Sequence, residues 1–149
     1  MAAQVPLSDL PVLELGPGTG VVTEALLECI APERLTSIEY DASFAALVQQ
    51  RFPKVRVIQG DAFDLDKTLG SYEPLAAVVS SLPLINFPVE MRLKLLEGIF
   101  ARLASGAPFI QFSYRLRPPI SAPPGIAVRR AAVIWLNLPP ARVWVYKRT

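Results

Sequence analysis

The chain has 149 residues, the usual size of one domain, and its 52% hydrophobic and 19% charged residues exclude a disordered chain. It has no histidine and one cysteine, Cys29, which excludes an intrachain disulfide and leads us to expect a reducing compartment and no bound metal. The net charge of +2 conceals an asymmetry, because all thirteen acids and seven Lys/Arg lie up to Glu97, whereas eight Lys/Arg and no acid follow it. This basic third indicates an anionic partner, either nucleic acid or a phospholipid surface, or else a solvated basic edge.

No segment is typical of a membrane span or of a signal peptide. The longest uncharged run, residues 74–89, is interrupted by Pro83 and Pro88 and is shorter than the ~18–20 apolar residues of a span. The first ten residues contain neither a basic segment nor a long apolar core. We expect residues 1–149 to form one domain, with residues 1–10 as a short leader.

The chain then alternates apolar segments with segments of helical spacing. Residues 12–15 predict a buried strand, and residues 21–30 predict a helix that ends before Pro32. A second strand at 35–40 precedes a helix that Asp41 or Ser43 can cap. The elements expected next are that helix up to about residue 51, strands at 55–59, 76–80 and 108–114, and a short helix or turn at 64–69.

The clearest predicted helix follows residue 88 and ends at Ser105-Gly106. Most of its charged residues fall off one apolar stripe, so the helix is expected to pack on a sheet, although such a stripe could also lie on a membrane. The stripe consists of Val89, Leu93, Leu96, Phe100 and Leu103.

The C-terminal part has a different character. Residues 117–125, R-P-P-I-S-A-P-P-G, exclude a helix or a central strand and predict a stiff loop. Residues 127–136 and 142–146 alternate apolar with basic or polar residues and predict an antiparallel pair at one edge. The whole pattern predicts an α/β fold with a mostly parallel, seven-stranded sheet, an antiparallel edge hairpin and helices on both faces.

The segment 14–20, E-L-G-P-G-T-G, forms the first turn from strand to helix. Glycine is required where a turn needs positive φ or where a ligand lies against the main chain. A dinucleotide fingerprint, G-x-G-x-x-G, would place the third glycine at position 21, which is Val21. The spacing here is E-x-G-x-G-x-G, with Gly16, Gly18 and Gly20.

This spacing resembles that of class I methyltransferases, which use S-adenosylmethionine and release S-adenosylhomocysteine. The resemblance implies a Rossmann-like fold in which the loop Gly16, Pro17, Gly18, Thr19 and Gly20 lies under the cofactor. It also implies that Glu14 lies near the methionine ammonium group of the cofactor.

Acids at the ends of two further strands fit the same cofactor. Glu39, about twenty residues after the glycines, can accept hydrogen bonds from both ribose hydroxyls, and Asp61 can accept from the adenine amino group. The predicted cofactor-binding set is completed by Ala62, whose amide can donate to the ring, by Tyr40 and Phe63 beside the adenine, and by Ser80 at the end of the fourth strand.

The segment after this strand, S-S-L-P-L-I-N-F-P, is expected to contact the methyl acceptor. The front half of the chain resembles ribosomal RNA adenine dimethyltransferases (V-L-E-L-G-P-G-T-G, I-E-Y-D, Q-G-D-A). In their N-L-P-Y-like motif an Asn orients the amine and an aromatic ring stacks on the base. Here Ser81 replaces the Asn and Leu84 the aromatic residue, which argues against nucleic acid.

The same segment, with F-I-Q-F-S-Y and the Pro-rich loop, resembles bacterial phospholipid N-methyltransferases. This resemblance implies successive methylation of phosphatidylethanolamine towards phosphatidylcholine at the membrane surface. We expect a monomer that is peripheral on the cytoplasmic side of the inner membrane. Tyr114 is the candidate proton acceptor, Phe87, Phe112 and Tyr114 offer aromatic faces to the growing positive charge, and Trp135 and Trp144 are expected to face the bilayer with the basic third. The candidate substrate-binding residues are Ser81, Leu82, Phe87, Arg115 and Arg117.

Two alternatives stay open: methylation of RNA adenine or another amine, and a non-enzymatic module that binds the cofactor or a membrane. The first strand begins about eleven residues from Met1, whereas class I methyltransferases usually have closing helices before it. We therefore expect a shortened or core form without this lid helix, with loose cofactor binding and slow turnover.

Overall fold

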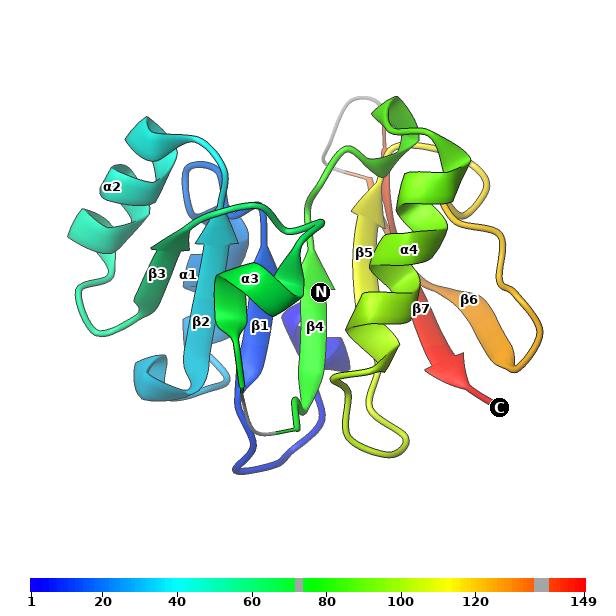
Figure 1. Cartoon of the computed structure of the whole chain (residues 1–149), viewed down its shortest axis with the longest axis horizontal. Coiled ribbons are helices and arrows are strands. Elements are labelled where there is room, and N and C mark those ends of the chain that lie inside the picture. The colour runs from blue at the N-terminus through cyan, green and yellow to red at the C-terminus, as the bar shows by residue number, and fades with distance from the viewer. Residues whose placement is uncertain (72–73, 136–139) are drawn as a thin grey trace.

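The computed structural model describes residues 1–71, 74–135 and 140–149, which form one sheet with helices around it (Figure 1). A short 3₁₀ helix, η1 (Ala2–Gln4), precedes the sheet, and η2 (Pro32–Arg34) and η3 (Leu84–Asn86) lie in loops. The strands are β1 (Val12–Leu15), β2 (Leu35–Glu39), β3 (Arg56–Gln59), β4 (Ala77–Ser80), β5 (Phe109–Ser113), β6 (Ile126–Ile134) and β7 (Ala141–Arg148). The helices are α1 (Val21–Leu27), α2 (Ala42–Arg51), α3 (Leu65–Leu69) and α4 (Val89–Phe100).

The sheet has seven strands in the order β3-β2-β1-β4-β5-β7-β6. Strands β1 to β5 pair in parallel, whereas β7 is antiparallel to both β5 and β6. The strand order reverses between β1 and β4, and ligands of open α/β sheets bind at the carboxyl ends of the strands beside such a switch point. The predicted mostly parallel sheet with an antiparallel edge pair is confirmed.

Helices lie on both faces of the sheet, as the sequence predicts. In Figure 1, α3 and α4 lie in front of the sheet, and α1 lies behind it. The face under α4 packs Leu13, Leu15 and Phe109 against Leu96 and Ile99, all of which are fully buried. The opposite face packs a second set of buried residues: Val12, Leu26, Ile30, Leu35, Val79, Ile110 and Val143.

The buried face of α4 differs from the predicted stripe. Leu96 and Phe100 are buried as expected, but Val89 is 60% exposed and Leu93 is 39% exposed. The helix is rotated so that Leu95 and Ile99 complete its buried face instead. Val89 is the first residue of the helix, at the carboxyl edge of the sheet, and it stays largely exposed there.

The Pro-rich segment after β5 is held to the body of the protein by two side chains. The Tyr146 hydroxyl, fully buried, donates to the Ile120 carbonyl at 2.9 Å and accepts from the Ile120 N–H at 3.2 Å. Arg92 of α4 donates to the Phe87 and Pro119 carbonyls at 2.7 and 2.9 Å. These bonds join the loop after β4 to the loop after β5.

Two smaller differences concern the C-terminal half. Strand β5 ends at Ser113, so Tyr114 lies just beyond it. Trp144 is only 7% exposed within β7, so it does not face outward as expected, whereas Trp135 is 75% exposed. The expected joint between the edge strands, with the end of strand 127–136, lies partly at residues 136–139, outside the described residues. Among the helices of the described ranges, none combines the length and apolar character needed to cross a membrane.

Candidate functional site

The glycine loop follows β1 and enters α1 at the carboxyl edge of the sheet. Gly16, Gly18 and Gly20 have φ values of 69°, 57° and 93°, a region that other residues rarely adopt. The Gly16 N–H donates to the Ile38 carbonyl at 2.9 Å, and the Gly18 N–H donates to Glu39 Oε2 at 2.9 Å. The loop is therefore tied to the end of β2 by both backbone and carboxylate.

The three glycines meet different surroundings. A Cβ atom at Gly16 would lie 2.8 Å from Leu82 Cδ2, and one at Gly20 would lie 2.8 Å from the Phe52 ring. A Cβ atom at Gly18 would meet no atom within 4 Å. Neighbouring side chains of the protein thus explain why Gly16 and Gly20 carry no side chain. Of the three glycines, Gly18 alone faces open space. Of the loop's other predicted residues, Pro17 is buried and Thr19 is exposed, and the Thr19 carbonyl accepts a hydrogen bond from Arg51.

Glu14 lies inside β1 and is fully buried. Its Oε2 accepts hydrogen bonds from Thr23 Oγ1 at 2.8 Å and Ser37 Oγ at 2.6 Å, while its Oε1 has no hydrogen-bond partner in the described part of the chain. Desolvation by burial raises the pKa of this carboxyl, the two hydroxyl bonds lower it, and the charge of Glu39 raises it. A buried carboxylate with an unpartnered oxygen suits a cationic group, which is the chemistry that the cofactor's ammonium supplies.

A pocket of about 420 Å³ opens beside the glycine loop, within the range usual for small-molecule sites. Asp61 lies at its rim, where Oδ1 accepts from the Phe63 N–H at 2.8 Å, and Tyr40 is 77% exposed. The Phe63 and Phe87 rings lie 4.7 Å apart. The pocket brings together four predicted cofactor-binding residues, two predicted for the substrate and three that sequence reasoning missed: Tyr40, Asp61, Ala62, Phe63, Leu82, Phe87, Ile38, Gly60 and Met91.

A second pocket, of about 300 Å³, lies between the loops after β4 and β5. Leu82 lines both pockets and so forms part of the wall between them. Ser81, Tyr114 and Arg115 also line the second pocket, as expected for the acceptor side, whereas Phe87 lies on the cofactor side. Ser80 is fully buried, and its Oγ accepts from the Leu82 N–H at 3.2 Å, which positions the loop rather than a ligand.

A basic pocket of about 480 Å³ continues from the second one. The two share Ile85, Tyr114, Arg115 and Pro119, and the basic pocket adds Arg117. Both Arg115 and Arg117 are exposed, and Tyr114 is 52% exposed with its ring 5.1 Å from that of Phe112. An anionic group bound here would lie beside the predicted acceptor pocket.

Sequence reasoning missed Gln111, whose side chain supports the acceptor loop from β5. It is fully buried, and its Nε2 donates to the Leu82 and Phe112 carbonyls at 2.9 and 2.7 Å. One signal was available, since a single Gln within the apolar strand F-I-Q-F-S is expected to be buried only with partners.

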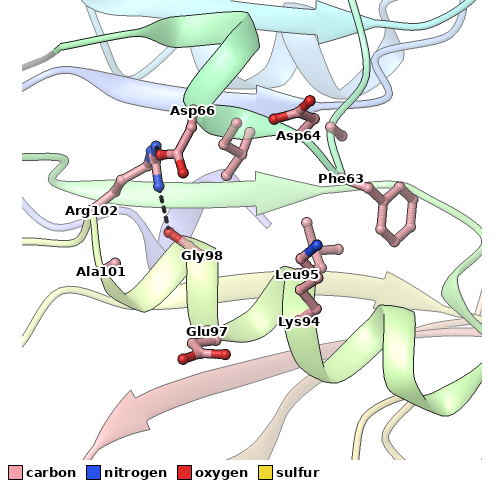
Figure 2. Close-up of a pocket in the computed structure, with 11 residues that line it drawn as sticks. Phe63, Asp64, Asp66, Lys94, Leu95, Glu97, Gly98, Ala101 and Arg102 are labelled. Carbon is pink, nitrogen blue, oxygen red and sulfur yellow. Dashed lines mark hydrogen bonds and ion pairs between the residues drawn. The ribbon is translucent and has the colours of Figure 1, made fainter.

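A further pocket, of about 450 Å³, lies between α3 and α4 (Figure 2) and shares Ala62 and Phe63 with the pocket of about 420 Å³. Arg102, 6% exposed, pairs with Asp66 there and donates to the Gly98 carbonyl at 3.1 Å. Its lining mixes acids and bases, which is typical of a structural ion pair between two helices. Within residues 1–71, 74–135 and 140–149, no three His, Cys, Asp or Glu side chains are grouped as a metal site would require.

Comparison with known proteins places this geometry in a family. The family model described as "Ribosomal RNA adenine dimethylase" matches residues 2–102, more than half of the chain. An ornithine lipid N-methyltransferase of Singulisphaera acidiphila is 34% identical over 108 residues, which cover 68% of this chain and 56% of the relative. Ribosomal RNA small subunit methyltransferase A of Caulobacter vibrioides is 35% identical over 145 residues, 94% of this chain and 53% of the relative. The chain thus spans about half the length of these curated relatives.

Solved structures share the fold at lower identity. A ribosomal RNA methylase of Streptococcus thermophilus has a TM-score of 0.70 at 18% identity, and the match covers 99% of this chain and 92% of that one. The structure of TrmN from Thermus thermophilus has a TM-score of 0.69 at 21% identity, covering 94% and 44%. With the glycine loop, the buried Glu14 and the family match together, the chain belongs to the ribosomal RNA adenine dimethylase family of S-adenosylmethionine-dependent N-methyltransferases.

Proposed function

We propose that this chain transfers methyl groups from S-adenosylmethionine to the amine of a membrane lipid headgroup, with phosphatidylethanolamine as the first candidate substrate. The observation that carries the proposal is the environment of Leu84. This residue takes the place of the base-stacking aromatic in the N-L-P-Y-like motif, and it is 1% exposed within the core under α4. Leu84 lines the acceptor pocket, but an aliphatic side chain packed into the core has no aromatic face on which a flipped base could stack.

The charges around the acceptor pocket support a headgroup with an anion beside its amine. Arg115 and Arg117 are exposed in the adjoining basic pocket, and the expected hydrogen bonds to a phosphate or carboxylate oxygen are charge-assisted. The name of one relative, the ornithine lipid N-methyltransferase, points to the same class of acceptor.

The exposed side chains near this pocket fit a membrane surface. Register places Trp135 at the same end of the sheet as Tyr114, because Val133 and Ser113 both pair with Arg142 of β7. Trp135 is 75% exposed, and Leu116, which lies between Arg115 and Arg117, is 73% exposed. Aromatic and basic side chains together favour an anionic bilayer interface. The proposal therefore includes a peripheral position on the cytoplasmic face of the inner membrane.

The chemistry is an in-line displacement for which the protein mainly supplies position. The cofactor supplies a methyl group on a sulfonium, whose C–S bond breaks as the amine nitrogen forms its bond to that carbon. The lipid ammonium first loses one proton, and in a chain without histidine Tyr114 is the predicted group to receive it while its own phenolic proton passes to water. Because Leu82 lines both pockets, the methyl group of the cofactor and the amine of the acceptor would meet next to this residue.

A second candidate, methylation of adenine in RNA, is supported by the family model and by the Caulobacter relative. The basic C-terminal third also suits a phosphate backbone. The buried Leu84 argues against RNA, because it leaves Phe112 and Tyr114 as the aromatic residues of the acceptor pocket on which a base could stack.

Radiolabelled methyl transfer decides between the two. The chain is incubated with labelled S-adenosylmethionine and either phosphatidylethanolamine–phosphatidylglycerol vesicles or small-subunit ribosomal RNA. We expect label in the lipid and none in the RNA. Replacing Arg115 and Arg117 by Gln should lower lipid methylation about 30-fold, at roughly 1 kcal/mol for each basic residue near the surface.

A matched pair of charges serves as the control. Lys54 and Arg56 are exposed at the N-terminal end of β3, the opposite edge of the sheet, and their replacement by Gln should leave lipid methylation within twofold. Label in the RNA alone would overturn the lipid proposal, and equal losses from both charge pairs would overturn the assignment of the basic pocket.

A further inference from the structure

Two buried polar atoms in the wall of the acceptor pocket have no hydrogen-bond partner among the residues that the structure describes. They are Ser81 Oγ and Gln111 Oε1, and both residues line the same pocket of about 300 Å³. Buried polar atoms in folded proteins are nearly always paired, so two orphans in one pocket wall indicate a ligand that pairs with them.

The orientation of the Gln111 amide follows from its neighbours. Its Nε2 lies 2.9 Å from the Leu82 carbonyl oxygen and 2.7 Å from the Phe112 carbonyl oxygen. Two carbonyl oxygens require a donor between them, so the NH₂ group must point at them and the opposite orientation is excluded. The remaining atom, Oε1, is therefore an acceptor without a donor.

The position of Gln111 links it to both ligand pockets. In the sheet Gln111 pairs with Ser80, and its amide bonds the carbonyl of Leu82, so it lies against the chain on either side of Ser81. The side chain of Leu82 covers Gly16 of the cofactor loop. The two orphan acceptors thus lie on the acceptor side of the wall, next to the cofactor side.

We propose that Gln111 Oε1 and Ser81 Oγ bind the N–H groups of the acceptor amine, an inference that rests on the proposed function. A neutral primary amine has two N–H groups and one lone pair. When both N–H groups donate to the pocket wall, the lone pair is directed away from these oxygens, towards the wall that Leu82 shares with the cofactor pocket. An amide oxygen from β5 then takes the part that the Asn amide has in the N-L-P-Y-like motif.

Access to these atoms requires a local adjustment, because both are shielded from water. Leu82 and Phe112 are half-buried and Tyr114 is exposed in the same pocket, and an incoming headgroup displaces them. The amine gives up its water as it reaches the orphan oxygens, and these oxygens replace the lost hydrogen bonds.

A purely structural explanation competes with this proposal. Trp144 is the cross-strand neighbour of Gln111, and its Nε1 is also buried without a partner. If the indole N–H is the natural donor to Gln111 Oε1, Gln111 only holds the sheet together. Replacing Trp144 by Phe separates the two explanations.

The test is calorimetric titration of short-chain phosphatidylethanolamine into the full chain saturated with S-adenosylhomocysteine. We expect Gln111→Met to weaken lipid binding at least tenfold and Ser81→Ala about fivefold, with affinity for S-adenosylhomocysteine within twofold of the native chain. Short-chain phosphatidylcholine, which has no N–H group, should bind at least tenfold more weakly and should not respond to either substitution.

Thermal unfolding distinguishes a binding role of Ser81 from a structural one, because the two roles predict opposite changes in Tm. Ser81→Ala removes an oxygen that makes no hydrogen bond, so its Tm should equal or exceed that of the native chain. The control Ser8→Ala removes a bond that Ser8 Oγ accepts from the Leu10 N–H at 3.1 Å near the N-terminus, and it should lower Tm without changing lipid affinity.

The proposal is overturned if the native chain binds no amine lipid, if Ser81→Ala leaves lipid affinity unchanged, or if Trp144→Phe reproduces the loss caused by Gln111→Met. Should Gln111→Met fail to fold, Ser81→Ala decides alone. Lipid that binds with the expected sensitivity but receives no methyl group contradicts the proposed function and leaves this amine site standing.

Discussion

The two halves of the sheet build their parts of the site in different ways. On the side of β1, β2 and β3, the predicted cofactor site combines a glycine loop, which Glu39 holds through the Gly18 N–H, with a pocket lined by residues at the ends of β2 and β3 such as Tyr40 and Asp61. On the side of β4, β5 and β7, the acceptor pocket is made of loops held by long-range side-chain bonds, as from Tyr146 to Ile120. A cofactor common to many enzymes suits a fixed backbone cradle, whereas acceptor choice resides in loops that can change.

The sharpest way to break this comparison is Glu39→Ala. Glu39 accepts from the Gly18 N–H at 2.9 Å and from the Asp41 N–H at 3.2 Å, and it is the predicted partner of the ribose. Its removal should raise the Kd for S-adenosylmethionine about 100-fold, or about 2.7 kcal/mol, and leave acceptor affinity within twofold. Calorimetry with each ligand separately checks both numbers.

Asp41→Ala is the matched control for Glu39→Ala. Asp41 Oδ1 caps α2 by accepting from the Ser43 and Phe44 N–H groups at 2.8 and 3.0 Å. Loss of this cap should cost about 1 kcal/mol of stability with little change in cofactor affinity. If Glu39→Ala changes the Kd less than threefold, the cofactor is not held by the acid at the end of β2.

A smaller effect on the opposite half is expected from Tyr146→Phe. Its buried hydroxyl serves both backbone groups of Ile120, and burial raises the pKa of this phenol. Without it two buried groups lose their partner, so the free energy of unfolding should fall by about 1–3 kcal/mol in urea titration. Because Pro119 lines the acceptor pocket, lipid affinity should fall while cofactor affinity holds.

Tyr40→Phe is the control for Tyr146→Phe. It removes an exposed hydroxyl and should change the free energy of unfolding by less than about 0.5 kcal/mol. A loss of cofactor affinity in Tyr146→Phe as large as the loss of lipid affinity would show that the two halves of the site are one coupled unit.

The same contrast explains what the sequence could predict. The glycine loop and the acids at the ends of β2 and β3 are local features, so their place at the carboxyl edge follows from strand and turn patterns alone. The buried face of α4 does not, because the sheet and the loop joined by Arg92 decide which of Val89, Leu95 and Ile99 are covered.

Strand register decides the rest of the acceptor half. Trp144 pairs with Gln111 of β5, and both side chains are buried. From the sequence alone Trp144 is expected at the surface, because it lies in the basic C-terminal third. Gln111 itself becomes a site residue only because Ser80 lies beside it in the sheet, although η3 and α4 separate the two residues along the chain. Contacts of this kind depend on tertiary packing, and no local pattern encodes them.

The smallest expected effect is a pH dependence that arises from Glu14 in the half of the sheet that holds the glycine loop. Burial raises the pKa of Glu14, so between its ordinary pKa and the raised value the folded state binds more protons than the unfolded state. The stability contribution of Glu14 therefore falls as pH rises through that window. Glu14→Gln should flatten this part of the dependence of Tm on pH.

Cofactor binding should show the opposite trend at the same residue. A cationic ammonium beside Oε1 favours the charged carboxylate, so affinity for S-adenosylmethionine should rise with pH over the window in which native stability falls. Glu14→Gln should weaken binding about fivefold, or about 1 kcal/mol, above the window and remove the slope. A native Kd that is independent of pH there would mean that Glu14 supports the sheet through Thr23 and Ser37 and does not meet the cofactor's charge.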